Sequence, residues 1–178
     1  MKDDELVRLI SNPDTATKGF EILVIQYREQ LYWKIRHLVL DHDDASDVLQ
    51  NTFIKVWKNI RNFEGKSALS TWLYRIAINE SLDFIRRQKN KISTDEIEGS
   101  VANRLLADEY FDGDETQAML QDAIASLPEV QRTVFTLKYY NGMKYSDISK
   151  ILGTSEGALK ASYHLAVKKI TEYFKMHD

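Results

Sequence analysis

The chain has 178 residues, a hydrophobic content of 43%, a formal net charge of −3, and only two prolines and seven glycines. This composition favours an ordered, mostly helical protein that buries one sizeable core or two small ones. The absence of cysteine excludes disulfides, thiolate nucleophiles and zinc–thiolate sites. No apolar run reaches about 18 residues, so we expect no membrane insertion. The acidic N-terminus lacks a hydrophobic signal core, which predicts a cytoplasmic location.

Charge divides the chain into three parts. Residues 1–92 hold 15 basic and 13 acidic side chains, residues 93–115 hold 1 and 8, and residues 116–178 hold 8 and 6. Two mildly basic domains of net +2 are therefore expected to flank an acidic linker of net −7. Like charges extend a chain, which favours a solvated linker. The other interpretation is that the segment occupies a basic channel on a partner, anchored by Leu105, Leu106, Tyr110 and Phe111.

The first domain begins with two predicted helices. Residues 4–10 form a short helix that ends at the turn 11–14. Residues 20–38 form a longer one, with Arg28, Lys34 and Arg36 expected on its solvent face. Its inner face carries an apolar residue at every third or fourth position. These residues are Phe20, Leu23, Val24, Tyr27, Leu31, Ile35 and Leu38.

Residues 41–44 form an acidic cluster with one histidine. Adjacent residues on a turn rarely converge on one metal ion, and acids suit the positive N-terminus of the helix that follows. That helix, residues 45–60, has outward residues Asp47, Gln50, Asn51, Ile54 and Lys58. The apolar Ile54 in a polar face suggests docking on a protein, although a solvated face explains it as well. The inner stripe is Ala45, Val48, Leu49, Thr52, Phe53, Val56, Trp57 and Ile60.

The next predicted element is a loop at residues 62–67, broken by Gly65, in which Ser67 is expected to cap a helix that runs to about Gln88. Leu69, Leu73, Ile76 and Ala77 face inward on this helix. Another face carries Trp72, Arg75, Asn79 and Arg86 at steps of three, four and seven. Aromatic and guanidinium groups in one stripe suit single-stranded DNA. The residues alone leave open whether Trp72 belongs to that stripe or to the core.

The second domain contains four predicted helices. The first two span residues 116–127 and 128–140, with Pro128 at the first helical position of the second. A short helix, residues 144–152, ends at Gly153, and Ser155 caps a longer one that reaches residue 170. A short helix, a tight turn and a longer helix are typical of a DNA-binding helix-turn-helix, or of an ordinary helical hairpin. The long helix buries Leu159, Tyr163, Ala166 and Ile170, and exposes Gly157, Lys160, Ala161, His164 and Lys168.

Several of these segments together resemble a known family. Residues 44–50, 52–53, 56–57, 63–67 and 71–79 resemble region 2 of bacterial sigma factors of the extracytoplasmic-function (ECF) group. Residues 127–132 and 155–160 resemble region 4 of the same factors. The resemblance covers about four fifths of the chain in the right order. It implies an all-α fold of two small domains, region 2 at residues 1–92 and region 4 at residues 116–178, joined by the linker 93–115.

The resemblance also implies a function, that of a transcription initiation factor. Such a factor binds core RNA polymerase, on the clamp of the largest subunit and on the flap, and directs it to promoter DNA. The outward face of residues 45–60 would dock on the clamp. Many members of the family carry a glutamate where this chain has Asn51. The polymerase-binding residues implied are Asp47, Gln50, Asn51 and Ile54.

The DNA-binding residues implied fall into two sets. The loop at residues 63–67 and Asn79 would capture a base flipped out of the minus-ten element, beside Trp72 and Arg75 at the fork of the duplex. In region 4, Lys160, Ala161 and His164 would meet bases of the minus-thirty-five element. The minus-ten set is Phe63, Glu64, Gly65, Lys66, Ser67, Trp72, Arg75, Asn79 and Arg86. The minus-thirty-five set is Ser155, Glu156, Gly157, Lys160, Ala161, Ser162, His164 and Lys168.

Two features bear on how tightly this chain would hold DNA. Many relatives carry an arginine where Ser162 stands and a capping hydroxyl where Lys144 stands, so phosphate contacts are fewer here and binding is expected to be weak and salt-sensitive. A net charge of +2 on each domain also predicts that affinity comes from a larger partner and from tethering of two weak modules.

Other functions stay open at this point. A stand-alone dimeric helix-turn-helix regulator would need a dimer surface and a palindromic site. An enzyme has little support, because the histidines at positions 37, 42, 164 and 177 are scattered and no phosphate-cradling glycine loop appears. No cofactor or metal is implied. The sequence does not disclose whether an anti-sigma factor is a further partner.

Overall fold

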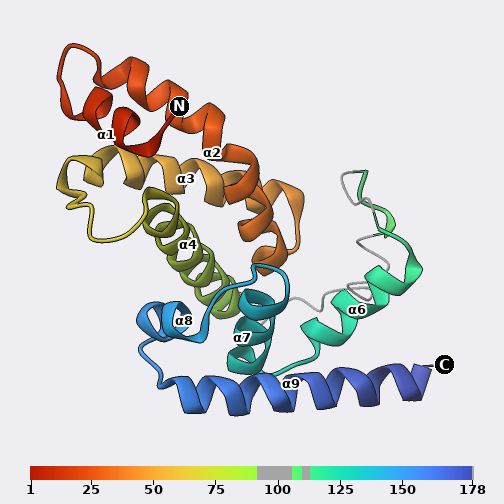
Figure 1. The fold of residues 1–178 in the computed structure, drawn as a ribbon. Coiled ribbons are helices and arrows are strands. Elements are labelled where there is room, and N and C mark those ends of the chain that lie inside the picture. The colour runs from red at the N-terminus through yellow and green to blue at the C-terminus, as the bar shows by residue number, and fades with distance from the viewer. Residues whose placement is uncertain (92–105, 110–112, 178) are drawn as a thin grey trace. The chain divides into compact units, whose positions relative to one another are not determined.

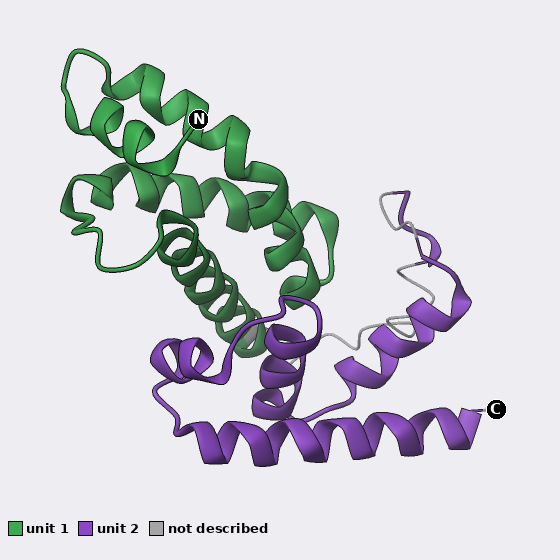
Figure 2. Ribbon diagram, viewed as in Figure 1, with its two compact units in different colours: residues 1–91 green, residues 92–178 purple. Residues whose placement is uncertain are grey.

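The computed structural model describes residues 1–91, 106–109 and 113–177. Its regular elements are helices, as Figure 1 shows, so the predicted all-α fold is confirmed. The chain forms two compact units, residues 1–91 and residues 92–178 (Figure 2). Among the helices of the described ranges, none combines the length and the apolar character that crossing a membrane requires.

The N-terminal unit is a bundle built around its second helix. Helix α2 packs against α1, α3 and α4, and α1 also touches the 3₁₀ turn η1. The core joins residues from every helix, including Leu6, Leu31, Val56 and Leu73, each less than 1% exposed. The elements are α1 (Asp3–Ser11), α2 (Ala16–Val39), α3 (His42–Asn59), η1 (Ile60–Asn62) and α4 (Leu69–Lys91).

The acidic turn before α3 has a structural role. The Asp41 carboxylate accepts a hydrogen bond from the Asp44 backbone N–H at 3.0 Å, which satisfies one free donor of the helix start. The acids therefore lie at the start of α3, where the sequence predicted that they would suit the positive helix N-terminus. Burial, together with the nearby carboxylates of Asp41, Asp47 and Asp43, raises the pKa of Asp44.

The C-terminal unit places two helices on a long third one. Helices α7 and α8 pack against α9, and α6 closes the unit from the other end of α9. Phe135, Ala166 and Ile170 are central to the core. The elements are α6 (Glu115–Ala125), α7 (Glu129–Tyr139), α8 (Tyr145–Leu152) and α9 (Glu156–His177).

The turn between α8 and α9 matches the sequence prediction. Gly153 ends α8 in the left-handed region, with φ at 66° and ψ at 27°, a conformation that glycine adopts without steric cost. The Ser155 hydroxyl accepts from the Ala158 N–H at 3.3 Å and caps α9. The short helix, the turn and the long helix therefore have the geometry of a helix-turn-helix.

Four local predictions are wrong. Arg36, expected in solvent, is 4% exposed, because neighbouring helices pack against α2. Trp57, expected inside, is 42% exposed. Ser67 does not cap α4: the helix begins at Leu69, and the Ser67 hydroxyl donates to the Ala68 carbonyl oxygen. Pro128 lies at the cap position before α7, one residue earlier than expected.

The acidic segment is described only at residues 106–109 and 113–115. Leu106, one of its predicted anchors, is 48% exposed. The other three proposed anchors, Leu105, Tyr110 and Phe111, lie outside the described residues. Whether the segment fills a channel on a partner therefore remains a prediction.

Candidate nucleic-acid and protein interfaces

The outer face of α3 presents the residues expected to bind polymerase. Asp47, Gln50, Asn51 and Ile54 are all exposed, and the Ile54 side chain retains 46% of its accessible surface. Polar groups around one accessible aliphatic residue are typical of the rim and centre of a protein interface. The structure therefore brings this set together on one helical surface.

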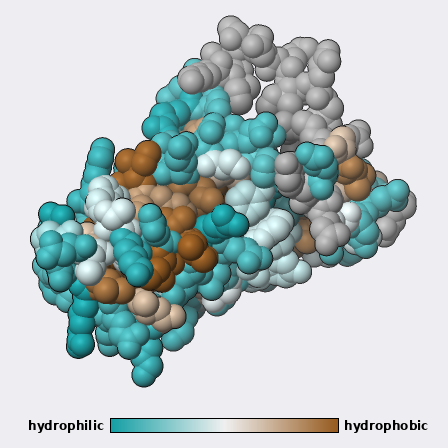
Figure 3. All heavy atoms as spheres, turned by 90° about the horizontal axis from the view of Figure 1, so that it is seen from above, coloured by the Kyte–Doolittle hydropathy of each residue, from teal (hydrophilic) through white to brown (hydrophobic). Residues whose placement is uncertain are grey.

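An apolar groove lies beside this face, between α2 and α3. Its volume is about 460 Å³. The Phe20 and Trp57 rings meet edge to face across it, with centroids 4.9 Å apart. Figure 3 shows hydrophobic residues gathered on this part of the N-terminal unit. The lining residues are Thr17, Phe20, Glu21, Val24, Gln50, Phe53, Ile54 and Trp57.

Sequence reasoning missed this groove although a signal was present. The α2 residues in the lining, from Thr17 to Val24, are spaced at i, i+3, i+4 and i+7, and the α3 residues from Gln50 to Trp57 repeat the same spacing. Each set is one helical stripe. Only the packing of the two helices could show that the stripes face a common groove rather than the core.

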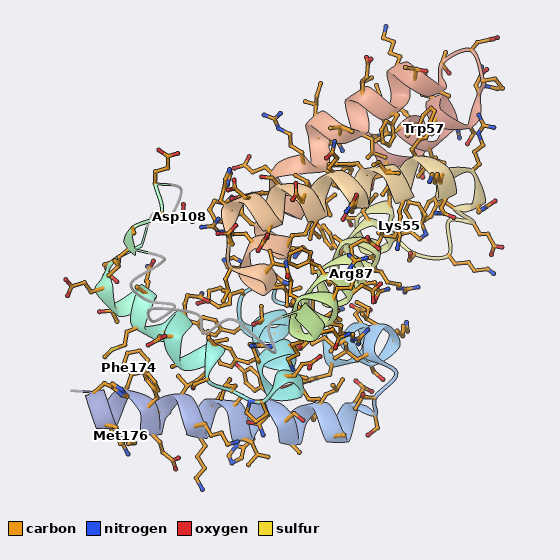
Figure 4. All side chains as sticks on the ribbon, turned by 180° about the vertical axis from the view of Figure 1, so that it is seen from behind. Lys55, Trp57, Arg87, Asp108, Phe174 and Met176 are labelled. Atoms are coloured by element: carbon orange, nitrogen blue, oxygen red, sulfur yellow. The ribbon has the colours of Figure 1, made fainter. Side chains whose placement is uncertain are left out.

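An ion pair joins α3 to α4. The Lys55 ammonium on α3 pairs with the Glu80 carboxylate on α4. The Lys55 side chain is 53% exposed, whereas that of Glu80 is 7% exposed. Figure 4 shows Lys55 and Trp57 on α3. A nearly buried carboxylate depends on its partner for stabilisation, so Lys55 fixes α3 against α4.

The loop before α4 is joined to that helix by an aromatic contact. The Phe63 and Trp72 rings are tilted by 56°, with centroids 5.4 Å apart. Both rings are half-buried against the core. Trp72 therefore serves the core and still presents part of its ring at the surface, which combines the two interpretations that the sequence left open.

The same loop keeps its polar residues accessible. Gly65 has φ at +69°, and a Cβ added there would have no atom within 4 Å, so its conformation, not crowding, requires glycine. Glu64 and Lys66 form an exposed ion pair across it, and Ser67 is half-buried. The loop is therefore held at Phe63 and exposed to solvent at Glu64, Gly65 and Lys66.

The α4 stripe runs away from this loop. Asn79 is exposed and lies one turn beyond Arg75. Arg75 is half-buried, and its Nε has no hydrogen-bond partner within the described residues. Arg86 is exposed and pairs with Asp83 at 3.3 Å. Trp72 thus contacts the loop, Arg75 and Asn79 follow it along α4, and Arg86 lies about 10 Å beyond Asn79.

The exposed face of α9 presents the second predicted set. Lys160, Ala161, His164 and Lys168 are exposed, and Ser162 is half-buried. Leu159 and Ala166 on the other face are less than 1% exposed. The start of α9, at Ser155, Glu156 and Gly157, is also open to solvent. A helix of this kind, buried on one face and carrying exposed polar and basic side chains on the other, fits a DNA major groove.

Comparison with known proteins agrees with this geometry. Residues 23–91 match the family model for Sigma-70 region 2, and residues 117–170 match that for Sigma-70, region 4. A helical bundle with an open α3 face, followed by a helix-turn-helix unit, is thus the arrangement of a sigma-70 factor.

Curated relatives narrow the class. The chain is 31% identical over 176 residues to the RNA polymerase sigma-H factor of Pseudomonas aeruginosa, covering 90% of this chain and 87% of that protein. It is 31% identical over 156 residues to the ECF RNA polymerase sigma factor SigW of Bacillus subtilis, covering 82% and 83%. The chain belongs to the ECF group of RNA polymerase sigma factors, which are transcription initiation factors.

Two solved structures are similar in fold. The sigma factor RpoE of Bartonella quintana, crystallised with the anti-sigma factor NepR, gives a TM-score of 0.70 at 25% identity, covering 89% of this chain and 98% of that chain. CnrH, in complex with the cytosolic domain of CnrY, gives the same TM-score at 21% identity and covers 99% of both chains.

Proposed function

We propose that this chain directs core RNA polymerase to specific promoters, with its N-terminal unit opening the minus-ten element and its C-terminal unit reading the minus-thirty-five element. The observation that carries the proposal is the separation of three exposed faces, on α3, α4 and α9, each inside a matched sigma region. One face suits a protein, one suits unpaired bases and one suits a duplex.

The α3 face is proposed to dock on the clamp of the largest polymerase subunit. Asp47, Gln50, Asn51 and Ile54 supply its polar rim and aliphatic centre. The adjoining groove extends this surface, because Gln50 and Ile54 belong to both. An apolar side chain of the partner that filled the groove would be the energetic centre of the interface. The C-terminal unit is proposed to lie on the polymerase flap.

The α4 face is proposed to hold the melted minus-ten strand. A flipped base would enter beside Phe63 in the loop and accept or donate hydrogen bonds at Asn79, whose amide offers both. Trp72 would stack at the fork, and Arg75 and Arg86 would neutralise phosphates. Glu64, Gly65, Lys66 and Ser67 complete the loop in this proposal.

The α9 face is proposed to enter the major groove of the minus-thirty-five element. Lys160, Ala161 and His164 would contact base edges. Phosphates would be bound by the backbone N–H groups at the open start of α9 and by nearby side chains. The phosphate set proposed is Ser155, Glu156, Gly157, Ser162 and Lys168.

The remaining features follow from this assignment. A factor that works with core polymerase acts in the cytoplasm and needs no catalytic group or cofactor of its own. An anti-sigma protein is proposed as a further partner, by analogy with the Bartonella quintana factor, whose structure includes one. The α3 face would be one surface for such a partner to cover.

Replacement of Asn79 tests the minus-ten assignment. Asn79→Ala should leave binding to core polymerase unchanged and impair strand opening, because an exposed amide contributes nothing to the fold but would pair with the captured base. Permanganate reactivity of promoter thymines measures the opening. We expect a drop of about tenfold, the value of one or two hydrogen bonds to an unpaired base. Reactivity equal to that of the wild type would refute the role of Asn79.

A second variant distinguishes the proposed minus-thirty-five role of α9 from the proposed minus-ten role of α4. His164→Ala should change the minus-thirty-five preference in a selection from randomised promoters and should not alter permanganate reactivity on a promoter already bound. An unchanged preference would count against His164 as a base contact.

A further inference from the structure

Three aromatic rings of the C-terminal unit form a chain from its core to the start of α8. Phe135, 4% exposed, stacks on Tyr163 with centroids 5.6 Å apart and planes 13° apart. Tyr163 in turn meets the Tyr145 ring edge to face at 6.4 Å. Tyr145, the first residue of α8, is therefore held by packing that reaches the core.

Two lysines from different helices converge on the Tyr145 ring. The Lys138 ammonium on α7 lies 4.6 Å from the ring centre, and the Lys160 ammonium on α9 lies 5.7 Å from it. A cation within about 6 Å of an aromatic face is attracted to the ring quadrupole. Lys138 is held a second time, because it donates to the Met143 carbonyl oxygen at 3.2 Å.

Lys160 has no comparable second contact among the described residues. The flexible four-carbon stem of Lys160 allows its ammonium group to occupy many positions, and the Tyr145 ring favours one of them. Glu156 lies one turn earlier on α9 and is the nearest competing charge in sequence, and Asp147 lies on α8. No ion pair joins either carboxylate to Lys160 or Lys138 in the part of the unit that the structure describes.

We propose that Tyr145 is a positioning residue for duplex recognition, whose ring, fixed by Tyr163 and Lys138, holds the Lys160 ammonium on the exposed face of α9. Lys160 is the group that touches DNA, and Tyr145 acts through it. The proposal rests on the proposed function of this unit as the reader of the minus-thirty-five element. Ordering the side chain before binding lowers the entropic cost of its contact.

A double-mutant cycle tests the proposal in the full chain bound to core polymerase. Tyr145→Leu removes the ring, Tyr145→Phe keeps it, and Lys160→Ala removes the cation. The probe is a duplex taken from a selection with randomised minus-thirty-five sequences, and the readouts are affinity and base preference. Tyr139→Leu is the matched control, because Tyr139 also stacks on Phe135, with centroids 5.1 Å apart, and is 56% exposed.

We expect Tyr145→Leu to weaken duplex binding about two- to fivefold, the range of an exposed cation–π contact. It should also relax the preference at the same base position that Lys160→Ala relaxes. In the Lys160→Ala background, Tyr145→Leu should add nothing. Tyr145→Phe and Tyr139→Leu should behave as the wild type.

Three results would overturn the proposal: an unchanged affinity for Tyr145→Leu, an equal loss for Tyr145→Leu with and without Lys160, or a loss in Tyr145→Phe as large as that in Tyr145→Leu. The last would assign the effect to the hydroxyl. If wild-type holoenzyme selects no minus-thirty-five sequence at all, the proposed function fails and the positioning role fails with it.

A measurement on the wild-type chain does not depend on the folding of any variant. The protons on Cε of Lys160 should be shifted upfield by the Tyr145 ring current in an NMR spectrum of the chain labelled at lysine, and Lys160→Ala assigns the signal. A Lys160 signal at the position of an ordinary solvated lysine would contradict the ring contact.

Discussion

At the scale of single residues, the N-terminal unit is stabilised by polar and charged groups that are buried and paired between helices. Glu80 is 6% exposed, and Lys55 is the cation that pairs with it. Tyr27 buries its ring and donates its hydroxyl to Asp3 at 2.6 Å, and burial raises the Tyr27 pKa. Each enclosed polar group ties two helices together and is costly to leave without its partner.

Removing the Lys55 ammonium should destabilise the N-terminal unit, because the nearly buried Glu80 carboxylate would lose its partner. Lys55→Met should lower the free energy of unfolding by about 1–3 kcal/mol, because a buried charge loses its partner while the aliphatic stem is kept. Tryptophan fluorescence in urea measures this in one unit, because all three tryptophans, Trp33, Trp57 and Trp72, lie in residues 1–91. Lys58→Met, an exposed lysine on the same helix, is the control and should change little. Equal effects of the two variants would contradict the role of the pair.

His37 gives the same unit a pH dependence. Burial, with smaller effects of Lys34 and Arg36, lowers the His37 pKa to about 4. In the unfolded chain the group binds a proton near its usual pKa of about 6.5. Between these values the unfolded state holds more protons, so stability rises with pH and is lost as pH falls from about 6.5 toward 4.

The test compares pH 7 with pH 5. Wild type should lose about 1 kcal/mol more of its free energy of unfolding than His37→Gln over this range, after allowance for the partial exposure of the ring. Carboxylates that titrate in the same range are common to both proteins and cancel in the comparison. Parallel pH profiles would show that His37 is not the group responsible.

At the scale of elements, α1 is an addition that the region 2 match does not include, since that match begins at residue 23. The helix nevertheless supplies Leu6 and Ile10 to the core and touches η1, which leads into the loop at residues 63–67. Helix α1 therefore supports the turn that leads into this loop. Its close approach to α2 occurs at Gly19.

Enlarging Gly19 should separate the two helices. A Cβ at this position would lie 2.9 Å from both Ile10 Cγ1 and Leu9 Cβ, so a side chain forces α1 outward. Gly19→Val should cost about 1–3 kcal/mol, the usual cost of overpacking, measured by tryptophan fluorescence in urea. Gly157→Ala is the control for adding a methyl, because no atom lies within 4 Å of its Cβ. Its unfolding is followed by circular dichroism, because the C-terminal unit holds no tryptophan, and α9 should not be destabilised. If Gly19→Val were as stable as the wild type, α1 would move away from α2 without a cost in stability, which would contradict this prediction.

At the scale of the whole molecule, charge and tethering decide how the two units act. Each basic part carries only net +2, and the segment between them carries net −7. With so few cations to release counterions, duplex binding is expected to be weak and to be lost as salt rises. Two weak readers on one chain gain affinity only when a partner holds both at a usable separation.

Footprinting with and without core polymerase tests this reading. At about 150 mM salt, the chain alone should protect no promoter sequence, because a few phosphate contacts are screened at that ionic strength. Addition of core polymerase should produce protection over two elements, and a promoter that lacks either one should be bound more weakly. Protection of a palindromic duplex by the purified chain alone would instead favour a stand-alone dimeric regulator.

The sequence alone determined the parts of this protein that local chemistry controls. Helical periodicity located the buried stripes of α2 and α9, the glycine at 153 and the hydroxyl at 155 marked the turn between α8 and α9, and the motifs identified the family. These features depend on a residue and its neighbours three or four positions away, which the linear sequence contains.

Only the tertiary structure decided what lies between helices. It buried Arg36, exposed Trp57 over a groove, paired Lys55 with Glu80 across 25 positions, and brought Lys138 and Lys160 to one tyrosine ring. The spacing of residues along a helix shows whether one of its faces is apolar or charged. It does not show which face of another helix packs against it. That choice is made by the packing of all the helices at once, because each buried face must find a complementary surface.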